Sequence, residues 1–111
     1  QLHDCTIDQL QFNGRSGQLK LIGHYESGRP VSVVFLGVRA VDLLDLMAGN
    51  IILDLTQHSG AHMDKADYEK YTARGWPLTP ESKVFYISPS YGLDAVILAD
   101  SMVIQPNLAP N

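Results

Sequence analysis

In the first third of the chain, apolar residues gather in short stretches separated by turn residues, which is typical of β-strands joined by short turns. Two such stretches, residues 6–12 and 17–25, flank Asn13-Gly14, a pair that favours a hairpin because both residues tolerate positive φ. After a second break, residues 31–36 carry apolar side chains on both faces, as expected of a central strand. The pattern predicts three strands joined as an antiparallel meander.

The period changes in the middle of the chain. Apolar residues recur every third position across residues 38–47, which favours a short amphipathic helix that ends at Gly49-Asn50. A strand remains an alternative, because neighbouring leucines blur the period. Residues 51–56 begin with β-branched side chains and end in alternation, so a strand is predicted there.

Residues 57–82 then interrupt the strand pattern. Within them, residues 64–74 favour a helix that Asp64 would cap and Gly75 would end. This segment is predicted to be an excursion inserted between strands of the sheet.

Strand character returns in the last third of the chain. Residues 83–88 are predicted to form a strand, residues 89–92 a turn, and residues 94–104 a further strand with a kink at Asp100-Ser101. The elements together predict an α+β fold, predominantly antiparallel β-sheet with one or two short helices.

Size and composition set the number of domains. The chain has 111 residues, of which 45% are apolar and 18% charged, enough apolar material for one core. We therefore expect a single domain over residues 1–111. Residues 106–111 contain two prolines and little to bury, so a flexible tail is expected there.

Charge and cysteine content narrow the class of partner. The net charge is −4, and the eight lysines and arginines are scattered, so nucleic-acid binding, which needs a basic stripe, is not expected. No apolar run approaches the length of a membrane span, so no membrane partner is expected either. The single cysteine cannot form an internal disulfide, which favours a reducing compartment such as the cytoplasm.

Candidate chemistry is sparse. His58 and His62 have the four-residue spacing of a helical metal pair, but Ser59-Gly60 between them weakens the helix that such a pair needs. Cys5 lies near His3, yet a small buried thiol is the usual state of a lone cysteine. The serines of the 88–92 segment lack the Gly-x-Ser-x-Gly spacing of a nucleophile elbow. We predict no catalytic residue, no cofactor and no metal site, and therefore a binding protein rather than an enzyme.

The predicted excursion also gathers aromatic and acidic residues. Tyrosine and tryptophan anchor protein interfaces, and inserted loops on a rigid scaffold often carry binding specificity. The predicted partner-binding residues are Asp64, Asp67, Tyr68, Tyr71 and Trp76. The alternative interpretation is that these rings only seal the excursion against the sheet.

Three short patches of sequence carry a family resemblance. They are His3-Asp4 before a strand, residues 33–38 followed by 50–52, and residues 88–92 leading into 95–99. In order and spacing the chain resembles small bacterial immunity proteins of polymorphic toxin systems.

The resemblance implies a β-rich domain that binds and neutralises a cognate toxin in the cytoplasm by occluding it, with no catalytic residues. An acidic inhibitor would suit a basic toxin domain. The alternative function is a structural or regulatory interaction module, for instance a homo-oligomer that uses a sheet edge.

Overall fold

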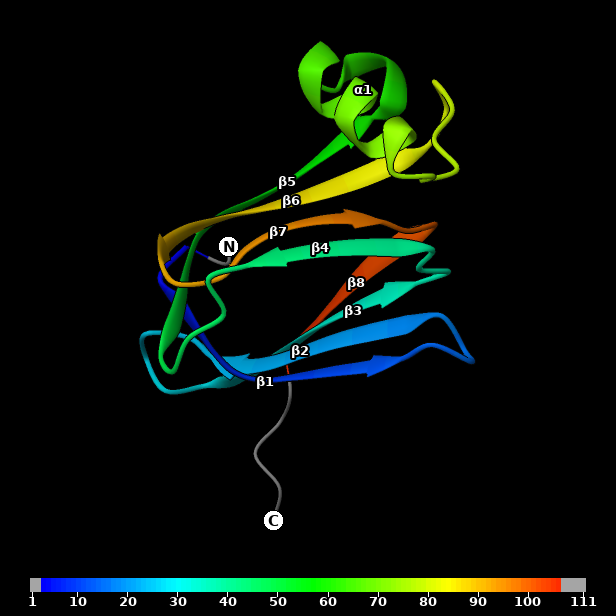
Figure 1. The fold of residues 1–111 in the computed structure, drawn as a ribbon. Helices are drawn as coiled ribbons and strands as arrows, with labels where there is room; N and C mark the ends of the chain where they lie inside the picture. The colour runs from blue at the N-terminus through cyan, green and yellow to red at the C-terminus, as the bar shows by residue number, and fades with distance from the viewer. Residues whose placement is uncertain (1–2, 107–111) are drawn as a thin grey trace.

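The computed structural model describes residues 3–106, and most of them belong to one antiparallel sheet (Figure 1). The strands are β1 (Cys5–Asn13), β2 (Gln18–His24), β3 (Pro30–Leu36), β4 (Ala40–Leu44), β5 (Asn50–Ser59), β6 (Lys83–Tyr91), β7 (Asp94–Leu98) and β8 (Ser101–Pro106). Between β5 and β6 lie a short 3-10 helix η1 (Gly60–His62) and the helix α1 (Lys65–Ala73). The predicted dominance of antiparallel sheet is confirmed. Within this part of the chain, no helix is long and apolar enough to cross a membrane.

The sheet order is β4-β7-β6-β5-β1-β2-β3-β8, and its two ends are covalently continuous. β3 runs into β4, and β7 runs into β8, so each pair is one long strand with a bend. β3 pairs with β8 and β4 pairs with β7, which makes the two long strands neighbours along their whole length. If β3–β4 and β7–β8 each count as one strand, the sheet has six strands, and each of them is hydrogen-bonded to two neighbours. The sheet therefore closes into a ring.

The bend in the ring has a local cause. Between the pairs Leu36–Ser101 and Ala40–Leu98, the first long strand takes four steps and the second takes three, so one extra residue is accommodated. Such a bulge bends a strand and increases its twist. Gly37 at this position has a φ of 65°, which glycine adopts without strain.

Two apolar clusters lie on opposite faces of the sheet. The first fills the ring, where Phe35 and Phe85 meet edge to face with their centroids 5.3 Å apart. The second lies outside, between the excursion and the outer face of β6, β7 and β4, and includes Tyr71, Val84 and Val96. The ring is therefore the scaffold, and the excursion is a cover packed on its outer wall.

The amphipathic helix predicted for residues 38–47 is wrong. The stretch contains β4, which pairs with β7 and alternates in the manner of a strand: Val41 packs on the interior cluster, whereas Asp42 faces α1. The three-residue spacing arose because the stretch spans both the bend and the strand. Residues with positive φ, Gly37 and Asp45, lie on either side of β4 and exclude a continuous helix.

The remaining boundaries follow local signals closely. The loop after Asn13 begins with the side chain of that residue accepting hydrogen bonds from the N–H groups of Arg15 (3.0 Å) and Ser16 (3.1 Å), as the hairpin signal suggested. The turn predicted at residues 89–92 lies later, because β6 continues to Tyr91. The predicted kink near Asp100 is confirmed.

The tail predicted for residues 106–111 is wrong at Pro106, which pairs with Val31 at the end of β8. The rest of that tail lies outside the described residues.

Candidate functional site

The excursion is held by its own helix caps. The Asp64 carboxylate accepts hydrogen bonds from the N–H groups of Ala66 (2.8 Å) and Asp67 (3.3 Å), which satisfies two donors at the start of α1. Gly75, with a φ of 90°, follows the end of the helix. Both features were predicted from the sequence. Because Asp64 caps α1, it stabilises the helix whether or not it also contacts a partner.

Tyr71 and Trp76 attach the excursion to the sheet. The Tyr71 side chain is 2% exposed, and its hydroxyl donates a 2.6 Å hydrogen bond to Asp42 on β4. Trp76 stacks on the Tyr71 ring with centroids 4.2 Å apart. Burial, followed by the hydrogen bond to Asp42, raises the pKa of Tyr71. Both rings therefore pack on the cluster between the excursion and the sheet, Tyr71 fully buried and Trp76 half-buried.

The other three predicted residues are Asp64, Asp67 and Tyr68, of which Tyr68 packs on the same cluster. Asp64 is exposed, and Asp67 and Tyr68 are half-buried. The Tyr68 hydroxyl lies 3.4 Å from the carbonyl oxygen of Leu78, a long hydrogen bond within the same segment. The three predicted aromatic residues thus pack the excursion onto the sheet.

Asp64 and Asp67, but not Tyr68, line a pocket between α1 and the sheet, here called the α1 pocket, with a volume of about 300 Å³. Its lining comprises Thr56, His58, His62, Met63, Asp64, Asp67, Tyr86 and Ser88. The sequence analysis identified Asp64 and Asp67 but missed the wall that β5 and β6 provide. That wall follows from register, because Thr56 pairs with Tyr86 and Asp54 with Ser88.

The α1 pocket has an acidic character. No lysine or arginine lines it. The Tyr86 hydroxyl donates a 3.3 Å hydrogen bond to Asp67. Burial, then the charge and hydrogen bond of Asp67, and then the charge of Asp64, raise the pKa of Tyr86 to about 12. The arrangement suits a cationic group, which two carboxylates and an aromatic face would attract together.

The shift at Tyr86 makes stability depend on pH. Because the ordinary tyrosine pKa is about 10, the unfolded chain loses this proton before the folded chain does. The stabilising contribution is complete below pH 10, and it is lost as the pH rises toward about 12. The free energy of unfolding should therefore fall across this window, and the fall should be smaller in Tyr86→Phe. Guanidinium unfolding at several pH values measures it.

Tyr91→Phe, which alters an exposed ring at the end of the same strand, is the matched control. An unchanged pH slope in Tyr86→Phe would contradict the assignment of this shift.

The two histidines of the sequence-based metal argument lie on different elements. His58 is on β5, with its ring edge-on to Tyr86 at 5.3 Å between centroids. His62 is in η1, where its Nδ1 lies 2.7 Å from Ser59 Oγ. Among residues 3–106, no three His, Cys, Asp or Glu side chains come together as metal ligands.

The Ser59–His62 contact is the one feature here that resembles nucleophilic chemistry. A serine nucleophile needs its histidine base to be oriented by a third group. In the described part of the chain, no carboxylate bonds the other ring nitrogen of His62. The two residues are three apart and flank the first turn of η1, so the contact is a local turn interaction.

Cys5 lies inside the ring and is fully buried. Burial, with a smaller contribution from the Asp8 charge, raises the pKa of its thiol, so the reactive thiolate is disfavoured. His3 points to its neighbour instead, with its Nδ1 3.0 Å from Asp4 Oδ2. The thiol therefore behaves as part of the apolar core.

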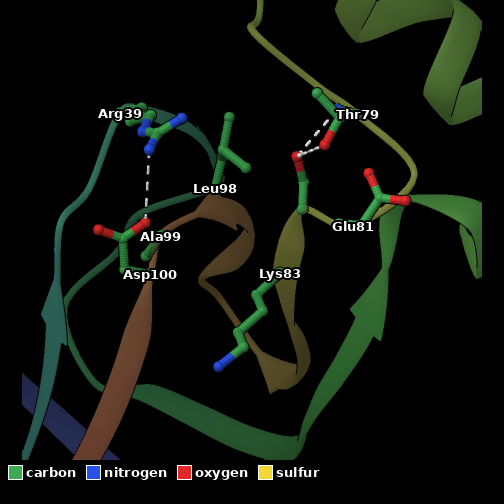
Figure 2. Close-up of a pocket in the computed structure, with 8 residues that line it drawn as sticks. Arg39, Thr79, Glu81, Lys83, Leu98, Ala99 and Asp100 are labelled. Atoms are coloured by element: carbon green, nitrogen blue, oxygen red, sulfur yellow. Dashed lines mark hydrogen bonds and ion pairs between the residues drawn. The ribbon is translucent and has the colours of Figure 1, made fainter.

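A second pocket of about 240 Å³ lies at the bend of the ring (Figure 2). Its charges are mixed: Arg39 and Asp100 form an ion pair at 3.6 Å, and Glu81 and Lys83 also line it. The hydroxyl groups of Thr79 and Ser82 lie 3.3 Å apart, and Figure 2 shows Thr79 on the far side of the pocket from Arg39. Balanced charges give this pocket no preference for an anion or a cation.

Comparison with known proteins gives little beyond the geometry. No protein-family model matches the sequence, and no curated protein matches it. An uncharacterized protein from Neisseria gonorrhoeae is similar in structure, at 16% sequence identity, with 95% of this chain and 93% of that chain covered and a TM-score of 0.48. A likeness this remote carries no argument about function.

Proposed function

We propose that this chain is a protein-binding domain that neutralises a cognate bacterial toxin in the cytoplasm of the producing cell by occluding it. The observation that supports the proposal is the α1 pocket: an open concavity that two carboxylates line and no lysine or arginine lines, between the excursion and the sheet. The family resemblance of the sequence supports the same function.

The chemistry of the pocket favours a basic partner. A lysine or arginine side chain of the toxin would meet Asp64 and Asp67 and lie against the Tyr86 ring. Charge-assisted hydrogen bonds of this kind are stronger than neutral ones and give planar guanidinium groups a defined orientation. The net charge of −4 adds a weaker attraction at long range.

Asp67→Asn tests this proposal, because it removes one charge and keeps the shape and the acceptor for Tyr86. In a pull-down from a lysate of the native cell, the unmodified chain should retain a basic protein, with one molecule of that protein bound per chain. Asp67→Asn should raise the dissociation constant of the complex with this basic protein roughly 30-fold, equal to about 2 kcal/mol, because the cation of the partner loses its charged acceptor. Isothermal titration at low and high salt measures the loss.

Glu69→Gln is the matched control, since it removes the same charge from an exposed position on α1 that does not line the pocket. It should leave affinity almost unchanged. Equal losses in the two variants would overturn the pocket as the contact, and failure to retain any basic protein would overturn the toxin-inhibitor function. Asp64 is unsuitable for this test because it caps α1.

A second candidate function is a structural or regulatory interaction module. The observation that favours it is a group of exposed apolar side chains on and after β4, away from the α1 pocket. A toxin gene beside this gene would favour the inhibitor, whereas a concentration-dependent oligomer with no other partner would favour the module.

A further inference from the structure

The edge strand β4 exposes an apolar surface. β4 pairs with β7 on one side, and no strand among the described residues pairs with its other side (Figure 1). Four large apolar side chains of this strand and the segment after it are 36–54% exposed: Leu43, Leu44, Leu46 and Met47. An apolar edge strand is a template for pairing with another strand, and proteins usually protect such edges.

We propose that a second copy of this chain covers the edge, with the two β4 strands paired antiparallel about a twofold axis at Asp42. In this register Ala40 lies opposite Leu44 of the second copy, and Val41 lies opposite Leu43. Apolar residues therefore meet apolar residues on both faces of the new ladder, which is the favourable arrangement for cross-strand neighbours.

Charge complementarity selects this register. The same twofold axis brings Arg39, just before β4, near Asp45, just after β4, of the second copy, twice in each dimer, and Arg39 also lies 3.6 Å from Asp100 of its own chain. Moving the axis to Leu43 would place Val41 against Asp45, and moving it to Val41 would place Arg39 against Leu43. Only the axis at Asp42 pairs opposite charges with each other and apolar residues with each other.

At the axis, Asp42 lies opposite Asp42 of the second copy, but each of these carboxylates already has polar partners within its own chain. The Tyr71 hydroxyl donates to it at 2.6 Å, and Arg74 Nη1 lies 3.5 Å away. Two guanidinium groups would accompany the two carboxylates, which reduces their repulsion.

The dimer is independent of the proposed toxin binding. β4 ends the sheet order, with β7 between it and the β6 and β5 strands that carry the wall of the α1 pocket. Pairing through β4 therefore leaves the pocket open in both copies.

Charge reversal tests the register with the full chain. Light scattering at increasing concentration should show the molar mass rising from 12.2 kDa toward that of two chains. Arg39→Asp or Asp45→Arg alone should raise the dimer dissociation constant roughly 30-fold, because two attractive pairs become two repulsive ones. An equimolar mixture of these two variants should dimerise again, since each heterodimer regains two opposite-charge pairs.

Asp45→Asn separates charge from backbone effects, because asparagine also tolerates the positive φ of this position (55°). It should weaken the dimer less than Asp45→Arg does. A chain that stays monomeric up to millimolar concentration would overturn the proposal, as would a dimer that neither reversal weakens. Failure of the mixture to recover would overturn the register.

Discussion

Replacing Phe85 with alanine should lower the free energy of unfolding by about 4 kcal/mol, among the largest effects available in this chain. Phe85 is 1% exposed, and its ring meets Phe35 edge to face inside the ring of strands. Removing it leaves a cavity between two walls that are fixed by hydrogen-bonded strands, so the neighbours have little freedom to close the space. Guanidinium unfolding followed by tryptophan fluorescence measures the change.

Phe12→Ala is the matched control, since the same side chain is 56% exposed near the end of β1. It should cost less than about 1 kcal/mol, as surface substitutions away from special features do. Similar losses in the two variants would mean that the interior of the ring is not the main core of the protein.

Replacing Asn50 with alanine should lower the free energy of unfolding by about 3 kcal/mol, because it leaves buried polar groups without partners. The Asn50 side chain is 4% exposed and joins two loops at the start of β5. Its Oδ1 accepts hydrogen bonds from the N–H groups of Met47 (2.7 Å) and Leu93 (3.0 Å), and its Nδ2 donates to the Met47 carbonyl. Thermal and guanidinium unfolding both measure the loss.

Asn13→Ala is a close control, because that asparagine also accepts two backbone N–H groups but lies in an exposed hairpin loop. Water can replace its carboxamide there, so the cost should be about 0.5 kcal/mol. If Asn50→Ala cost no more than Asn13→Ala, the side chain would not be the link between the two loops.

Local signals in the sequence predicted the elements that depend on few residues. The hairpin loop at Asn13 follows from one side chain that bonds nearby N–H groups, and α1 begins at a cap formed by Asp64. β4 was missed because its apolar residues fit two periods, and the choice between them was made by pairing with β7. The bulge at Gly37 also depends on a strand that lies far along the chain.

The candidate site likewise contains residues that could be identified from the sequence and residues that only the fold brings together. Asp64 and Asp67 could be identified because aromatic and acidic residues gather in the segment that interrupts the strands, whereas Tyr68, predicted with them, does not line the α1 pocket. Tyr86 could not, because its place opposite Asp67 depends on the register of β5 with β6 and on the way the excursion folds back over them. The inward orientation of Tyr71 likewise depends on Asp42, a residue of another strand.

The ring pairs strands that are far apart in the sequence, and this has a consequence for folding. β3 pairs with β8, so β3, in the first third of the chain, cannot complete its hydrogen bonding before residues 101–106 are in place. Contacts between such distant segments slow folding, because the entropy of closing the long loop is lost before the pairing stabilises the fold. During synthesis the β1–β2–β3 meander can form early, but β3 gains its second neighbour only after β8 has left the ribosome.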